Sequence, residues 1–148
     1  MLQGRYAGVL ELQGIELIAN KGIIEVSSLA NASFTDCKVI TDGNTWSSGI
    51  IAPSGYGVQP GTITVNSGEY RSAYPIYVLT SGGVVNVVGG KFVGTTAAIM
   101  VTSGSKNSSG LNSSNGIVNI NGGEFSGNWK LERYSASDVP TTSTLNII

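Results

Sequence analysis

The residues best suited to chemistry are carboxylates, and two of them recur at the same place in a repeated sequence. Glu69 precedes Tyr70, Glu124 precedes Phe125, and Lys91 takes the same place in the copy between them. Two carboxylates at a suitable separation can act as general acid and base in glycoside hydrolysis. If the copies stack as strands, two steps of about 4.8 Å separate this pair by about 9.6 Å, which is the upper limit for an inverting pair. The intervening lysine favours an ion-pair ladder on a solvated surface instead.

Other kinds of catalysis lack their usual residues. The chain contains no histidine, which removes the Ser-His and Cys-His dyads and the commonest transition-metal ligand. Asp36, Asp42 and Asp138 lie far apart in the repeat, and the single Cys37 is predicted to be a small buried residue. The SGG, VGG and NGG sequences lead from strand to strand without a GK[ST] motif, so they do not indicate a nucleotide site. We therefore predict no catalytic residue, no metal site and no cofactor.

A second kind of candidate site consists of aromatic residues in segments rich in Asn, Ser, Thr and Gly. Exposed rings among such residues suit the apolar faces and hydroxyl groups of sugars. The candidate ligand-binding residues are Trp46, Tyr56, Trp129, Arg133 and Tyr134. The alternative is that these rings stack inside a core or cover its end.

Composition narrows the class of protein. The 148 residues are 41% hydrophobic and 11% charged, which predicts one folded domain, and the 21 glycines indicate many tight turns. The formal net charge is −1 with no cluster of either sign, so we expect neither nucleic acid nor an anionic membrane as a partner. The sequence shows no signal peptide, and no apolar stretch approaches the roughly 18 residues that would suit membrane insertion.

An internal repeat carries the fold prediction. Its cleanest copies are GTITVNSGEY from Gly61, GVVNVVGGKF from Gly83 and GIVNINGGEF from Gly116, with an imperfect copy from Gly22 and a fragment at 144–148. The copies start at 22, 61, 83, 116 and 143, with spacings of 39, 22, 33 and 27 residues. About 22 residues are enough for three short strands and three corners, so the repeat predicts stacked turns of a three-sided parallel coil.

The alternation of residue types assigns a face to each strand position. In the first strand of each turn we expect two inward columns: Ile24, Ile63, Val85, Val118 and Leu145, then Val26, Val65, Val87, Ile120 and Ile147. The outward column Thr64, Asn86, Asn119 and Asn146 is predicted to form an amide ladder. The second strand is predicted to stack Tyr70, Phe92 and Phe125, extended by Phe34. In the third strand we align Leu79 with Val101, and assign CKVIT from Cys37 to the earlier turn.

With this pattern the chain resembles the right-handed parallel β-helices of the pectate-lyase-like superfamily. It is most similar to bacterial and phage surface proteins with I-x-I-x-G-G-x-F repeats, here VNVVGGKF and VNINGGEF. The resemblance implies an all-β, single-stranded right-handed parallel β-helix of about five turns. We expect one domain over 1–148, with the repeats at 22–148 and a degenerate turn at 1–21. This scaffold hosts lyases, hydrolases, adhesins and phage tailspikes, so it does not by itself imply an activity.

The excess residues in the longer turns point to a binding surface. They fall mainly in three segments, from Asp42, from Ser103 and from Ser135, which stacking would project from one edge. The alternative is that the insertions are neutral. The carboxyl end stops inside a first strand, which predicts either a fragment of a longer protein or an end that docks on another copy.

The function expected from these observations is non-catalytic. The chain is predicted to be a structural or adhesive module on a cell surface, in the extracellular space or on a virion, displaying loops to a glycan, a host or bacterial surface ligand, or a protein. The first alternative is a fragment of a polysaccharide lyase or hydrolase whose acidic site is completed by other turns or another subunit. A spacer without a ligand is the second alternative.

Overall fold

The computed structural model describes residues 2–4, 9–19, 24–26, 31–41, 50–52, 61–78, 81–103, 105–107, 110–112, 114–133 and 144–148. Every regular element among these residues is a β-strand. No helix in the described part of the chain is long and apolar enough to cross a membrane. The protein is therefore all-β, as the alternating sequence predicts.

Seventeen of the strands form three parallel sheets, which we call A, B and C. Sheet A contains β1 (Leu2–Gly4), β4 (Ile24–Val26), β7 (Ile50–Ala52), β10 (Ile76–Val78), β13 (Ile99–Ser103) and β18 (Trp129–Arg133). Sheet B contains β2 (Val9–Gln13), β5 (Asn31–Thr35), β8 (Thr62–Val65), β11 (Ser81–Val87), β16 (Ser114–Ile120) and β19 (Thr144–Ile147). Sheet C contains β3 (Glu16–Ala19), β6 (Cys37–Thr41), β9 (Gly68–Ser72), β12 (Lys91–Gly94) and β17 (Glu124–Ser126).

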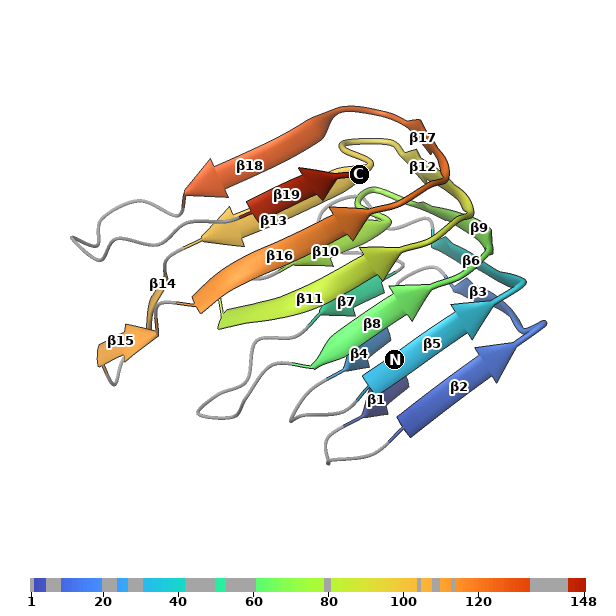
Figure 1. The fold of residues 1–148 in the computed structure, drawn as a ribbon, viewed down its shortest axis with the longest axis horizontal. Helices are drawn as coiled ribbons and strands as arrows, with labels where there is room; N and C mark the ends of the chain where they lie inside the picture. The colour runs from blue at the N-terminus through green and yellow to red at the C-terminus, as the bar shows by residue number, and fades with distance from the viewer. Residues whose placement is uncertain are drawn as a thin grey trace.

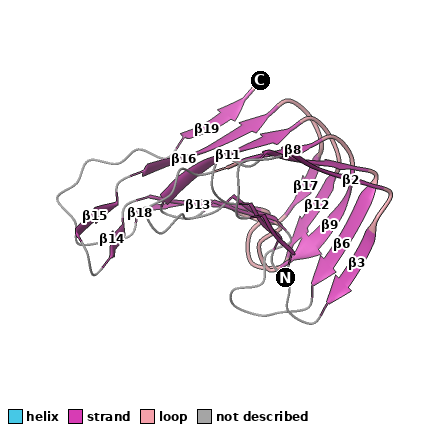
Figure 2. Ribbon diagram, turned by 90° about the horizontal axis from the view of Figure 1, so that it is seen from below, coloured by secondary structure: helices cyan, strands magenta, loops and turns pink. Residues whose placement is uncertain are grey.

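The chain visits the sheets in the fixed order A, B, C, and each strand pairs only with strands of the neighbouring turns. Figure 1 shows the strands of sheet B side by side, with the chain running from β2 to β19 across the sheet. Figure 2 shows the strands of sheet C turned away from those of sheet B. The antiparallel hairpin of β14 (Ser105–Asn107) and β15 (Gly110–Asn112) stands outside this order. The arrangement is consistent with a β-helix-like solenoid.

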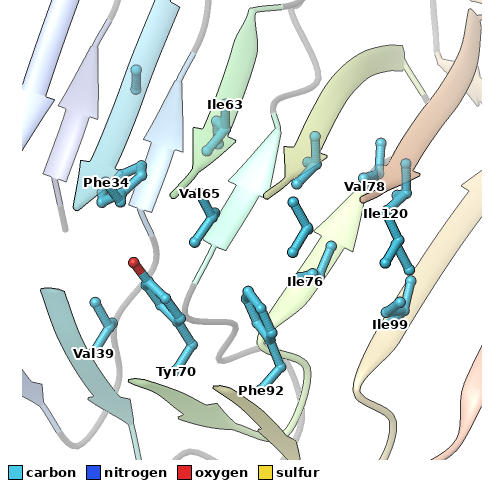
Figure 3. Packing of buried hydrophobic residues seen from close by; sticks show 14 of the residues in the cluster. Phe34, Val39, Ile63, Val65, Tyr70, Ile76, Val78, Phe92, Ile99 and Ile120 are labelled. Atoms are coloured by element: carbon cyan, nitrogen blue, oxygen red, sulfur yellow. The ribbon is translucent and has the colours of Figure 1, made fainter. Parts of the chain in front are cut away.

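The core lies between the sheets and consists of the residues that alternation directs inward. In sheet B, Ile63 pairs with Val85 and Val85 with Val118, and all three side chains are buried. Figure 3 shows Val65 of sheet B, Tyr70 and Phe92 of sheet C and Ile76 of sheet A converging on the same interior. Each turn thus buries its apolar residues against the turns beside it, as in other repeat architectures.

The aromatic column of sheet C is confirmed, but Phe34 does not belong to it. The rings of Tyr70 and Phe92 are stacked with centroids 5.1 Å apart, and those of Phe92 and Phe125 with centroids 4.9 Å apart. Below Tyr70 the column continues with Val39, whereas Phe34 pairs with Val65 in sheet B. A ring in an inward position fills the core from whichever sheet carries it, so residue type alone does not identify the sheet.

The first copy of the repeat was predicted in the wrong sheet. Ile24 and Val26 lie in β4 of sheet A, and the places predicted for them in sheet B are taken by Ala32 and Phe34. Both segments alternate, so the pattern fits either of them. The pairing of β5 with β8 and of β6 with β9 decides the matter, because it requires the same separation between the strands of sheets B and C in each turn.

Two assignments of the third strand were also wrong. The segment from Cys37 lies in sheet C as β6, and the sheet A strand of that turn is β7, within the segment predicted to be one long loop. Val78, rather than Leu79, pairs with Val101. Ser72 pairs with Gly94 and Ile76 with Ile99, so the corner after β12 contains one residue more than the corner after β9.

Candidate functional site

A column of alternating charge follows the outer face of sheet C. Successive strands align Glu16, Lys38, Glu69, Lys91 and Glu124. Lys38 Nζ donates to Glu16 Oε1 at 2.8 Å, and this hydrogen bond, together with the charges of Glu16 and Glu69, raises the pKa of Lys38. The register places Lys91 between Glu69 and Glu124, which fits an ion-pair ladder on a solvated face better than a pair of cooperating carboxylates.

The predicted amide ladder on sheet B is confirmed for its three asparagines. Asn119 Nδ2 donates to Asn86 Oδ1 at 2.8 Å, and Asn146 Nδ2 donates to Asn119 Oδ1 at 2.7 Å. Thr64 continues the same column, because it pairs with Asn86. Each amide therefore links neighbouring turns on the outside of the sheet, which is a structural role.

Removing the middle amide is expected to destabilise the stack moderately. Asn119→Ala breaks two side-chain hydrogen bonds, each contributing about 0.5–1.5 kcal/mol, so the free energy of unfolding should fall by about 1–3 kcal/mol. Urea unfolding followed by circular dichroism measures this loss. Asn121→Ala, at an exposed asparagine beyond the end of the same strand, is the matched control and should change stability by less than about 0.5 kcal/mol. Equal losses in the two variants would show that the ladder contributes nothing specific.

The structure separates the five candidate ligand residues. Trp46 falls between β6 and β7, Tyr56 between β7 and β8, and Tyr134 after β18, and these three lie outside the described residues. Trp129 begins β18, and Arg133 ends it. Four strand residues of about 3.3 Å each place these two backbone positions about 13 Å apart. Trp129 is therefore not placed beside Arg133.

Trp129 lies at the carboxyl-terminal end of the core. It pairs with Ile99 in sheet A, so it occupies the column that buries Ile99 and Ile76 in the preceding turns. Its ring meets Phe125 edge to face, with centroids 5.5 Å apart and planes at 76°. The side chain is nevertheless 40% exposed. Trp129 thus fits parts of both predictions from the sequence. It packs on the end of the core, as a structural residue would, and it is partly exposed to solvent, as a ligand-binding residue would be.

Two further apolar side chains are exposed on the last described strand of sheet B. Ile147 is 66% exposed and Ile148 is 85% exposed, although Ile147 pairs with the buried Ile120. The column is buried in earlier turns because the following turn covers it.

The long connections share a corner of the stack. Three connections from sheet A to sheet B are the longest of their kind: residues 53–61, 104–113 and 134–143. The other connections between these two sheets are shorter: residues 5–8, 27–30 and 79–80. In the second long connection the described hairpin of β14 and β15 extends away from the parallel sheets, as Figure 1 shows. Residues 42–49 instead connect sheet C to sheet A, because β7 interrupts the predicted first insertion.

The buried Cys37 thiol and Tyr70 hydroxyl contact backbone carbonyl oxygens inside the stack. Cys37 is buried as predicted, and its Sγ lies 3.3 Å from the Leu12 carbonyl oxygen. The Tyr70 hydroxyl donates to the Ser67 carbonyl at 2.9 Å, and burial above all raises the pKa of Tyr70 well beyond its ordinary value. Within the described part of the chain, no three His, Cys, Asp or Glu residues are grouped so that they could hold a metal ion.

Sequence reasoning missed the division of the first insertion. The sequence contains a signal for this division, since Ile50, Ile51 and Ala52 are an apolar run inside a polar segment. In the structure these three residues form β7. No family model, curated protein or solved structure matched the chain.

Proposed function

We propose that the chain is a non-catalytic structural and adhesive module whose sheet A to sheet B corner binds a glycan or a protein. In this proposal the stack is a single-stranded right-handed parallel β-helix of the pectate-lyase-like kind. Right-handed crossovers between parallel strands of one sheet are strongly preferred, which supports the handedness. The module belongs on a cell or virion surface or in the extracellular space.

The observation that carries the proposal is the position of the three longest sheet A to sheet B connections, one of which contains the β14–β15 hairpin. Connections at one corner of a stack project in one direction, and a repeat scaffold accepts them without changing its packing. Tyr56 and Tyr134 belong to these connections in the sequence, and Arg133 ends the strand before the last of them. Aromatic and arginine side chains in such a surface suit sugar or peptide ligands.

Shortening the hairpin connection tests the proposal with a replacement that the chain itself supplies. Val78 pairs with Val101 and Ser81 pairs with Ser114, so residues 102–113 can be replaced by Leu79-Thr80 without changing the register. We expect the parent chain to bind in a screen of glycans and surface proteins. The replacement and Tyr134→Ala should each weaken that binding at least about tenfold, a loss of about 1.4 kcal/mol, with an unchanged circular dichroism spectrum.

Controls separate this corner from the others. Val88→Asn is the matched surface variant, because Val88 is 51% exposed and the neighbouring turns carry Asn66 and Asn121 at its place. It should bind like the parent. If Trp46→Ala and Trp129→Ala lose binding while the hairpin replacement keeps it, the ligand is held by those two tryptophans rather than by this corner. A parent chain that binds nothing in the screen contradicts the proposal and leaves the spacer and the enzyme fragment as the alternatives.

A further inference from the structure

The chain contains two Asn-Gly dipeptides, and the structure places them in different surroundings. Asn115-Gly116 lies inside β16, where Ser114 and Gly116 both pair with β11 and Gly116 is buried. Asn121-Gly122 lies just beyond the end of β16, at the corner where the chain turns from sheet B into sheet C (Figure 1). Asn121 is exposed and Gly122 is half-buried. The same pair of residues thus occurs once in a paired strand and once at an exposed corner.

An asparagine that precedes a glycine can modify itself. The backbone nitrogen of the glycine loses its proton and attacks the Cγ atom of the asparagine side chain, and glycine favours this step because its backbone is free to rotate. The new C–N bond closes a succinimide ring, and the side-chain nitrogen leaves as ammonia. Water then opens the ring at either carbonyl carbon, which gives aspartate or isoaspartate. The reaction consumes water, releases ammonia and needs no oxidant or enzyme.

The reacting groups at Asn121 are not held in place by their neighbours. The Asn121 N–H donates to the Val87 carbonyl at 2.8 Å, and this bond fixes the end of the strand. Neither the side-chain amide of Asn121 nor the Gly122 N–H has a hydrogen-bond partner among the residues that the structure describes. Exposed backbone outside a ladder rearranges at little cost in free energy. The ring can therefore close at this corner while the strands stay paired.

Two comparable asparagines are protected. Asn66 occupies the same place in the corner two turns earlier, but its Nδ2 donates to Thr35 Oγ1 at 3.0 Å and the residue after it is serine. At Asn115 the protection comes from the backbone, because succinimide closure forces the asparagine out of the extended conformation. The pairing of Gly116 with Gly83 opposes that change.

The packing of the corner retains the glycine that makes Asn121 reactive. A Cβ on Gly122 would lie 2.6 Å from the carbonyl oxygen of Val88 in the preceding turn, so a larger residue does not fit there. The exposure of Asn121 does not depend on a missing neighbour. Val88 occupies the same place with a turn on each side and is still 51% exposed.

We propose that Asn121 is a site of spontaneous deamidation in the folded protein, where asparagine is converted to aspartate and isoaspartate, and that Asn115 is protected by its strand. The aspartate product adds a negative charge to the outside of the sheet B to sheet C corner. In the isoaspartate product the main chain also passes through the Cβ atom, which lengthens the corner by a methylene group. This modification is independent of ligand binding at the sheet A to sheet B corner.

The longer backbone conflicts with the pairing on both sides of the corner. Ile120 pairs with Val87 before the corner and Glu124 pairs with Lys91 after it, so the corners of these two turns have the same length. A methylene group added to one turn alone strains this match. The isoaspartate product is therefore expected to be less stable than the aspartate product.

Prolonged incubation of the folded chain at mildly alkaline pH, followed by tryptic digestion and tandem mass spectrometry, measures the reaction against an unincubated sample. The tryptic peptide of residues 107–130 contains both dipeptides, so each serves as the internal control for the other. Asn121 should lose its amide at least about tenfold faster than Asn115 in the folded chain. In the same peptide prepared synthetically, where no strand forms, the two asparagines should react at similar rates.

Two variants complete the test. Asn121→Gln keeps the amide on a longer side chain and should give little product at residue 121. Asn121→Asp carries the new charge without the added methylene group, and in urea unfolding it should be more stable than the isoaspartate fraction separated from the incubated chain. The proposal is overturned if Asn115 reacts as fast as Asn121 in the folded chain, or if Asn121 keeps its amide while the synthetic peptide loses it. An isoaspartate fraction as stable as Asn121→Asp would overturn the predicted strain at the corner.

Discussion

Replacing Gly68 by alanine is expected to be the most damaging single-methyl change in the described part of the chain. Gly68 has φ +121°, which L side chains rarely adopt, and a Cβ there would lie 2.1 Å from the Cys37 carbonyl oxygen and 2.9 Å from the Cys37 nitrogen. Both contacts are with backbone of the preceding turn, so no rotamer change relieves them. Backbone strain alone costs about 1–3 kcal/mol. With the collision, we expect the free energy of unfolding to fall by at least about 3 kcal/mol.

Urea unfolding of Gly68→Ala measures this effect, and Gly14→Ala is its matched control. Gly14 also has positive φ, of 63°, but a Cβ there meets nothing within 4 Å. This variant isolates the cost of the left-handed backbone, about 1–2 kcal/mol. The difference between the two variants reports how closely the corners of adjacent turns approach. Similar losses would contradict the close stacking of Cys37 and Gly68.

Truncating the middle ring of the aromatic column is expected to have an effect of comparable size. Phe92 is fully buried and stacks on Tyr70 on one side and on Phe125 on the other. Phe92→Ala removes a large buried side chain and leaves a cavity, which typically costs about 3–5 kcal/mol. Both stacking contacts are lost with the ring. We expect the thermal transition to move down by about 6–20 °C, since about 1 kcal/mol shifts it by about 2–4 °C in a domain of this size.

The end of the same column supplies the control for this truncation. Phe125 has one stacked neighbour in the column and is only half-buried, so Phe125→Ala should cost about half as much as Phe92→Ala. Differential scanning calorimetry of the two variants compares them under identical conditions. Phe92→Leu should retain part of the stability, because it fills part of the cavity. If Phe125→Ala is as damaging as Phe92→Ala, the column does not end where the structure places its end.

Local alternation was sufficient where a strand and its neighbours carry the same pattern. Ile63, Val85 and Val118 share a column as predicted, because the three copies have a β-branched apolar residue at the same distance from their glycines. The amide ladder and the aromatic stack follow from the same alignment. In these turns a shift of one residue would turn apolar side chains outward, so the register is strongly specified.

The amino-terminal half was less predictable because its copies differ from the consensus. Ala32 is small and Val39 replaces the aromatic residue, so neither stands out as a member of its column. Ile24 and Val26 lie in sheet A but have the same alternating pattern as the strands of sheet B. Alternation predicts which face of a strand points inward, but it does not predict which sheet the strand joins. The sheet is determined by the pairing of the strand with the neighbouring turns.

The candidate sites divide in the same way. The sequence by itself determined the all-β class, the inward columns of the clear repeats, the asparagine ladder and the place of Lys91 between two glutamates, since each depends on residue type at a fixed spacing. Only the tertiary structure decided that Trp129 packs against Phe125, that β7 divides the first insertion, and that Val39 rather than Phe34 continues the aromatic column. These features depend on which strands have a neighbour on each side, and that is a property of the assembled stack rather than of any one segment.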